Sequence, residues 1–413
     1  MTATRAIDGS VANTPSNLEA LPELLKQVCH GVAALTAGEK VDRHNLIAKC
    51  RAMTMAIETP RETMVEHCVI LSSTIAAISF GIDIGLWNLM VRNGDGAQRV
   101  SDLAASLGVD AILLGRMMRH LGATGHITET ASEEYQPTTF SKSLSLPRVA
   151  SGYRYISATA SSTFSFGDFC RQQAWKLPAP DKRSYFQCIH DTDLDFFAWF
   201  QQRGYGPDFN HLMGGFFMGR VPWMGPGYYP VQERLIDGAD TCPDAAFLVD
   251  IGGNVGHSLA DLKHHYPQLP GNLILEDLPA VINQIEHLDP SIIRIPYDFH
   301  TEQPIKGARA YFMRAILHDW SDQACLSILA RIKTAMKPGY SRLLINELVI
   351  PPTGVYHEAT ALDLQLMVLL SSWERTRSQW HDLLENRAGL RIMRIWDSGR
   401  ADSDNLIECE LVA

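Results

Sequence analysis

From residue 246 to the C-terminus, short apolar runs alternate with longer segments in which polar and apolar residues are mixed. Short apolar runs between polar turns are typical of buried strands, and the mixed segments are typical of helices that cover a sheet. The predicted strands are Phe247–Asp250, Asn272–Leu275, Ile292–Ile295, Ala310–Ile316 and Arg342–Ile350. This alternation predicts βαβ units, and therefore an α/β, Rossmann-like domain with a mostly parallel sheet.

The last part of the chain has a different pattern. Two strand-like runs, Leu390–Asp397 and Leu406–Val412, are separated only by polar turn residues. Because so short a connection joins antiparallel strands, we expect an antiparallel hairpin at the edge of the sheet.

Helix-forming residues dominate the first 160 positions. Two short amphipathic helices are predicted at Arg99–Ser106 and Asp110–Leu121, followed by a strand at Gly125–Thr128 and a returning strand at 133–138. This order is typical of a winged helix. The second helix is largely apolar, whereas a helix that reads DNA needs polar side chains, so we expect it to be buried and to serve packing or dimerisation.

Residues 161–240 are rich in aromatic side chains, glycine and proline. Packing between domains explains part of this composition, and a pocket for a flat, apolar substrate explains another part. We therefore expect a winged-helix-like dimerisation domain at 1–160, an aromatic connector that lines the substrate pocket at 161–240, and a catalytic domain at 241–413.

The 413 residues are too many for one ordinary core, and the net charge of −10 argues against nucleic-acid binding. The eight cysteines are scattered without a zinc-binding pattern, which indicates reduced thiols and a cytoplasmic protein.

The N-terminus has no secretory pattern. The apolar stretch Cys68–Leu89 is interrupted by polar residues and predicts a buried helix rather than a membrane span.

The first predicted strand leads into a glycine-rich turn. Asp250 ends the strand, and Gly252, Gly253 and Gly256 precede the helix-compatible segment Ser258–His265. Glycine permits positive φ and lets a ligand approach the backbone, and the helix offers free N–H groups. A nucleotide-like cofactor fits this turn, although glycines there can also serve packing alone.

Acidic residues follow the next two predicted strands as well. Asp277 follows the second strand and is placed to bind a ribose diol, and Asp298 with Phe299 follows the third and suits an adenine. In an open parallel sheet the ligand lies beyond the carboxyl ends of the strands. The alternative is that each aspartate only caps the segment after it.

His318 follows the fourth predicted strand at the same edge of the sheet. Two glutamates, Glu347 at the end of the fifth strand and Glu374 further along, are candidates to converge on it. A histidine base needs an acceptor on its second ring nitrogen, and glutamate supplies one.

Several motifs in this order resemble the class I S-adenosylmethionine (SAM)-dependent O-methyltransferases of the plant caffeic-acid type and their fungal secondary-metabolism relatives. The motifs are Asp250-Ile-Gly-Gly-Asn-Val-Gly, Asp277-Leu-Pro, Ile316-Leu-His-Asp-Trp-Ser-Asp, Ile345-Asn-Glu-Leu and Glu374-Arg-Thr followed by Trp380. The resemblance implies SAM as cofactor, a homodimer formed through the front domain, and no need for a metal.

The resemblance also implies roles for individual residues. His318 is expected as the general base, with Glu347 and Glu374 beside it. The expected cofactor-binding residues are Asp250, Gly252, Gly253, Gly256, Asp277, Leu278, Asp298, Phe299 and Arg314. Two positions depart from the family pattern: Asn254 replaces the middle glycine of the turn, and Arg314 stands where plant members carry lysine.

The predicted reaction is methyl transfer to a phenol or enol hydroxyl of a fungal-type secondary metabolite. Some fungal members of the family are pericyclases, which hold SAM but catalyse dehydration or cycloaddition. Because such members tend to carry a cation at the base position and this chain keeps His318-Asp319, methylation is the favoured interpretation.

Overall fold

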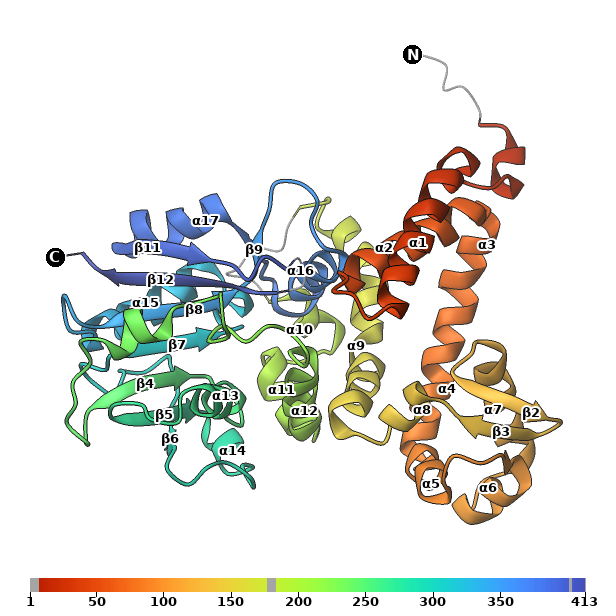
Figure 1. The fold of residues 1–413 in the computed structure, drawn as a ribbon, viewed down its shortest axis with the longest axis horizontal. Helices are drawn as coiled ribbons and strands as arrows, with labels where there is room; N and C mark the ends of the chain where they lie inside the picture. Colours follow the sequence, from red (N-terminus) through yellow and green to blue (C-terminus); the bar gives the residue numbers. More distant parts are fainter. Residues whose placement is uncertain (1–6, 177–182, 401–402, 413) are drawn as a thin grey trace. The chain divides into compact units, whose positions relative to one another are not determined.

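The computed structural model describes residues 7–176, 183–400 and 403–412. The chain divides into two compact units, Met1–Tyr153 and Arg154–Ala413. Figure 1 shows a helical first unit and a second unit built on a large sheet.

The first unit begins with a series of helices. They are α1 (Leu21–Thr36), α2 (Arg43–Ile57), α3 (Pro60–Val65), α4 (Leu71–Asp83) and α5 (Leu86–Asn93). The long helical stretch ends after Asp83 because Gly85, with φ +76°, starts α5 in a new direction.

The winged-helix pattern is confirmed in the same unit. It contains helices α6 (Val100–Leu107) and α7 (Ala111–Ala123) and a three-stranded sheet. The strand order in this sheet is β1 (Gln98–Arg99), β3 (Glu134–Pro137) and β2 (Ile127–Ala131). Asp110 caps α7 by accepting the N–H of Leu113 at 2.8 Å.

One face of α7 is buried as expected, with Leu114, Met118 and Leu121 in the core of the unit. The expected burial holds for this face only, because Ile112 is 76% exposed and Leu113 is 40% exposed. A helix repeats every 3.6 residues, so a sequence that is apolar on all sides still leaves one side facing outward.

Among the described residues, Pro60–Asp83 is the one helical stretch long and apolar enough to cross a membrane, by length and composition alone. The prediction of a buried helix at Cys68–Leu89 holds only in part: Ala77 and Ile78 are buried, whereas Val69 is 57% exposed. Helix α8 (Thr139–Ser143) follows the wing, and the boundary between the units falls within α9 (Pro147–Gln172).

The second unit contains a seven-stranded sheet of order β11-β12-β8-β7-β4-β5-β6. The strands are β4 (Ala246–Ile251), β5 (Asn272–Asp277), β6 (Ile293–Pro296), β7 (Ala310–Arg314), β8 (Arg342–Glu347), β11 (Leu390–Trp396) and β12 (Asn405–Leu411). Strands β4 to β8 pair in parallel, and β11 and β12 form the predicted antiparallel hairpin. The predicted α/β fold class is therefore confirmed.

Helices pack on both faces of this sheet, among them α13 (His257–His265), α15 (Asp322–Ala335) and α17 (Arg377–His381). Helices α10 (Tyr185–Ile189), α11 (Phe196–Gln202) and α16 (His357–Leu370) instead share a separate apolar cluster. Further helices of this unit are α12 (Gly206–Phe216) and α14 (Pro279–Ile282). Neighbouring residues of one strand, such as Leu248 and Val249, belong to two different apolar clusters. Since successive side chains of a strand point to opposite faces, each cluster is the core on one side of the sheet.

Two predicted strands are shorter in the structure. Strand β7 ends at Arg314, because Ala315 has φ +51° and a 3₁₀ turn follows at Leu317–Asp319. The predicted strand Arg342–Ile350 divides into β8 and β9 (Val349–Ile350), and β9 pairs in parallel with β10 (Arg375–Thr376) in a separate small sheet.

Candidate active site

The glycine turn follows β4 at the centre of the sheet, between β5 and β7. Gly252, Asn254 and Gly256 have φ of +68°, +55° and +86°, and asparagine tolerates this left-handed conformation better than most residues other than glycine. A Cβ on Gly252 would lie 2.6 Å from the Ile316 side chain. One on Gly253 would lie 2.6 Å from the Asp250 carboxyl carbon. A side chain at either position would force these neighbouring side chains to move, and the positive φ of Gly252 also favours glycine there.

Asp250 carries a carboxylate that is almost fully buried, and its Oδ2 atom has no hydrogen-bond partner within the described residues. Burial, with a smaller contribution from the neighbouring Asp277, raises the pKa of Asp250 to about 8 against the opposing effect of Arg314. An unpaired buried carboxylate is costly, so this oxygen fits a cationic or N–H-bearing ligand.

Asp277 links the end of β5 to the glycine turn. Its Oδ2 accepts the N–H of Asn254 and its Oδ1 accepts the N–H of Leu278, each at 2.7 Å. Burial raises the pKa of Asp277 to about 6, and the two N–H bonds lower it. A carboxylate has about four lone-pair sites, so two of them remain free to accept from a diol.

The Asp298 carboxylate is exposed and accepts the N–H of His300 at 2.9 Å. This contact agrees with the alternative interpretation from the sequence, in which the aspartate caps the segment after it. Phe299 lies over the glycine turn, 3.8 Å from the position of a Cβ on Gly252. Its ring also meets Trp320 edge-on, with 5.8 Å between the ring centroids. The end of β6 therefore supplies an aromatic wall to the turn.

Arg314, at the end of β7, lies within a second group of charges. Its Nη2 is 3.4 Å from Asp404 Oδ2, and its guanidinium lies 3.8 Å above the ring of Phe217. Arg220 joins the same carboxylate at 2.7 Å and also pairs with Glu358. The Nε atom of Arg314 is buried without a partner among the described residues, which makes it a free donor at this edge of the sheet.

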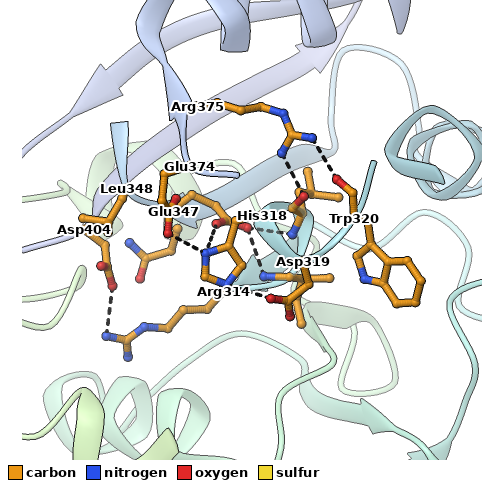
Figure 2. Close-up of polar contacts among 12 residues, drawn as sticks. Arg314, His318, Asp319, Trp320, Glu347, Leu348, Glu374, Arg375 and Asp404 are labelled. Carbon is orange, nitrogen blue, oxygen red and sulfur yellow. Dashed lines mark hydrogen bonds and ion pairs between the residues drawn. The ribbon is translucent and has the colours of Figure 1, made fainter. Parts of the chain in front are cut away.

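The three predicted catalytic residues are brought together. His318 lies on the 3₁₀ turn after β7, and its Nδ1 is 2.8 Å from Glu374 Oε1 and 3.5 Å from Glu347 Oε2. Asp319 lies on the other side of the ring, with its Oδ1 3.4 Å from Nε2 (Figure 2). His318, Glu347 and Glu374 each offer a ligand atom within 4.8 Å of the others, a spacing that also suits a metal ion.

These charges change the ionisation of the cluster. Burial alone would lower the pKa of His318, but the carboxylates of Glu347, Glu374 and Asp319 outweigh it and hold that pKa well above 6.5. Burial raises the pKa of Asp319 to about 7 and also raises that of Glu347. The carboxylates therefore favour the charged form of the imidazole, and the cluster titrates as one coupled group.

Sequence reasoning missed several residues that support this site. Asp319 was quoted within a motif, and its position directly after His318 was a usable signal. Arg375 follows Glu374 in the same way and proves to be fully buried. No signal pointed to Asp404 or Arg220, because Asp404 contacts Arg314, and Arg220 contacts Asp404, from segments far away in the sequence.

Most aromatic side chains of residues 161–240 are core residues. Phe186, Phe196, Trp199 and Phe200 are buried in one cluster. Phe197 instead stacks near Trp320, with 6.4 Å between the ring centroids. A pocket-lining role for this segment stays a prediction, and Phe197 is its best candidate because Trp320 is two residues from His318.

The comparisons with known proteins agree with this geometry. The family model of the O-methyltransferase domain matches residues 232–391. O-methyltransferase mfmE of Annulohypoxylon moriforme is 32% identical over 392 residues, which cover 94% of this chain and 96% of the relative. Demethylsterigmatocystin 6-O-methyltransferase of Aspergillus parasiticus is 33% identical over 78% of this chain and 82% of its own length.

Two solved structures share the fold. LepI in complex with SAM has a TM-score of 0.83 and 27% identity, with 95% of this chain and 100% of that chain covered. OxaC in complex with SAH and oxaline has a TM-score of 0.83 and 25% identity, with 95% and 99% covered.

A carboxylate, a glycine turn and a buried histidine at one edge of the sheet thus occur in a chain that aligns with these relatives over most of its length. The chain belongs to the SAM-dependent O-methyltransferases of the fungal secondary-metabolism family.

Proposed function

We propose that the enzyme methylates a phenol or enol hydroxyl of a fungal-type secondary metabolite, with His318 as the general base. The observation that carries this proposal is the 2.8 Å contact from His318 Nδ1 to Glu374, which directs Nε2 away from the glutamates. The residues on either side of this turn also reach the glycine turn: Ile316 lies against Gly252, and Trp320 lies against Phe299. These contacts support a position of the proposed base beside the proposed cofactor site.

We propose that SAM is held at the glycine turn by the residues expected from the sequence: Asp250, Gly252, Gly253, Gly256, Asp277, Leu278, Asp298, Phe299 and Arg314. The unpaired Asp250 Oδ2 and the close backbone at Gly252 support this assignment. When bound, SAM supplies a methyl group already activated by a positively charged sulfur, so the protein must align the acceptor and accept its proton.

The proton of the acceptor passes to Nε2 of His318 in this proposal. Glu374 accepts the N–H of Nδ1 and stabilises the imidazolium that forms, while Glu347 adds a second negative charge. A phenol has a pKa near 10 and an ordinary histidine about 6.5, so a raised pKa at His318 reduces the energy of proton transfer. His318 must first pass its resting Nε2 proton to an acceptor, and Asp319, whose Oδ1 lies 3.4 Å from Nε2, is the nearest described carboxylate that can take it. A bound sulfonium would favour this transfer by repulsion.

A second candidate function is a SAM-bound pericyclase that catalyses dehydration or cycloaddition. The imidazolium state of His318 favours it, because a dehydration needs a proton donor. The fold shared with a solved pericyclic reaction enzyme, at a TM-score of 0.83 and 26% identity, also supports it. A product whose mass lacks the added methyl group, formed only with enzyme, would select this candidate over methylation.

The other proposed partners are a sizeable aromatic or polyketide-like acceptor and a second copy of the chain. Large apolar side chains are exposed along the first helices: Leu25, Val32, Leu35, Ile47, Met55, Ile57, Met64, Val69 and Leu71. Exposed apolar surface of this extent marks an interaction site. A homodimer through this unit buries it, and the cytoplasmic location stays a prediction.

The first prediction concerns the base. H318Q should lower kcat about 100- to 10,000-fold, the range for loss of a general base, while the Kd for SAM measured by calorimetry stays within about twofold. H381Q is the control, because His381 pairs with Glu385 on the surface of α17. Unchanged turnover in H318Q would show that another group accepts the proton.

The second prediction concerns pH. Because the base acts only when it is unprotonated and its pKa is raised, kcat/KM should rise with pH along a limb whose midpoint lies above 6.5. In E374Q the midpoint should move to lower pH, since one stabilising carboxylate is gone. E385Q should leave it in place, and an E374Q profile identical to that of the wild type would contradict the assigned contact.

The third prediction concerns the cofactor turn. In G253A the new Cβ forces the Asp250 carboxylate or Leu275 to move, and an overpacking cost of about 1–3 kcal/mol corresponds to SAM binding weakened about 5- to 150-fold. G167A is the control, because a Cβ there meets nothing within 4 Å. Equal SAM affinity in both variants by calorimetry would remove Gly253 from the site.

The fourth prediction concerns assembly. Light scattering after gel filtration should give about twice the chain mass of 45.9 kDa. M64E combined with V69E should shift the equilibrium toward monomer, whereas I112E, on the exposed side of α7, should not. A wild-type protein that is monomeric at every concentration tested would contradict the proposed dimer.

A further inference from the structure

We infer that Arg375 is a positioning residue for the methyl-transfer reaction: it fixes the turn that carries His318 and so aims the imidazole. This inference rests on the proposed function of His318 as the base. It assigns to Arg375 a role distinct from that of its neighbour Glu374, which contacts the imidazole itself.

The contacts of Arg375 converge on both ends of the His318 turn (Figure 2). Its Nη1 donates to the carbonyl of Leu317 at 2.8 Å, and its Nη2 donates to the carbonyl of Trp320 at 2.9 Å. Asp322 balances the charge through contacts of 2.9 and 3.2 Å to Nη2 and Nε. The side chain is 1% exposed, so these bonds do not compete with water.

Other groups fix the remaining polar atoms of the turn. Glu347 Oε1 accepts the N–H groups of Ile316 and Leu317 at 3.0 and 2.7 Å, while its other oxygen faces the imidazole. The Sγ of Cys325 lies 3.2 Å from the Leu317 carbonyl, as a weaker donor to the same oxygen. Glu347 therefore holds the N–H groups of the turn, and Arg375 holds its carbonyls.

The small parallel sheet explains why these groups act together. Arg375 pairs with Val349 in the β10–β9 ladder, so the segment that contains Glu374 and Arg375 is tied to the segment that begins with Glu347. Trp373 and Trp380 also flank the guanidinium, at 5.7 and 5.3 Å from their ring centroids. A movement of this ladder would shift both glutamates and the turn together.

Lysine is not an adequate substitute at this position. A guanidinium is planar and offers five donors in a fixed fork, whereas an ammonium is a compact point charge that would leave one of the two carbonyls unbound. A displacement of about 1 Å at a reacting group costs on the order of 100-fold in rate. The turn can thus loosen and slow the reaction without loss of the fold.

The test compares R375K with R387K. Arg387 donates to the other oxygen of the same Asp322 at 2.5 Å, and no bond from it to the turn is present in the described residues, so R387K is a matched control. R375K should lower kcat about 10- to 100-fold, with the Kd for SAM within about twofold, while R387K keeps both values.

A second measurement distinguishes a change in the position of the imidazole from a loss of folding stability. Histidine labelled with 13C at Cε1 reports the pKa of the His318 imidazole by NMR, with H318Q used to assign the signal. In R375K the imidazole moves away from its carboxylates, so this pKa should fall and the acid limb of kcat/KM should move with it. Cys325→Ala should shift the His318 pKa and the acid limb of kcat/KM in the same direction by a smaller amount. This variant replaces R375K in the test if R375K does not fold.

The inference is overturned if R375K and C325A leave the His318 pKa and the acid limb at the wild-type values, whatever happens to the melting temperature. It is also overturned if R387K reproduces the effect of R375K. Failure of the proposed function gives a different result. H318Q would then retain methyl transfer, while NMR titration of the wild type and R375K would still show whether Arg375 fixes the position of the imidazole.

Discussion

The structure of the active site depends on one buried imidazole among three carboxylates. His318 would be costly to charge in a buried place, yet Glu347, Glu374 and Asp319 make the charged form the stable one. Each carboxylate is in turn costly to bury without a positive partner. The fold must therefore hold the whole group in one geometry, and the surrounding turns and short strands serve this constraint.

The order of the strands supplies the place for this group. Strand β4 lies between β5 and β7, so the glycine turn and the His318 turn both leave the sheet at its carboxyl edge. Ligands bind at such a point in open parallel sheets because the loops separate there. Ile316 and Trp320 lie on either side of His318 and reach Gly252 and Phe299, so packing connects the His318 turn with the glycine turn.

The sequence predicted those features that depend on local patterns. Apolar runs gave the strands of the sheet, and polar turn residues gave the hairpin. The pattern could not show that β7 would stop at Arg314, because that end is set by Ala315 and by a distant carboxylate, Glu347. Long-range contacts of this kind leave no periodic signal in the chain.

The same reason explains the supporting residues that sequence reasoning missed. Asp404 meets Arg314 across 90 positions, and Arg375 meets Leu317 across 58. An arginine that follows a glutamate in the sequence is compatible with an exposed ion pair, and equally with a buried guanidinium that donates to backbone carbonyls. Only the folded chain distinguishes them, because burial and the positions of backbone carbonyls decide which one forms.

The most direct test of the central claim is a crystal structure with S-adenosylhomocysteine and an acceptor bound together. The account predicts one acceptor oxygen about 3 Å from His318 Nε2, on the side that faces the sulfur of the cofactor product. A structure in which Nε2 contacts only Asp319, with no acceptor oxygen between the imidazole and the sulfur, would contradict it.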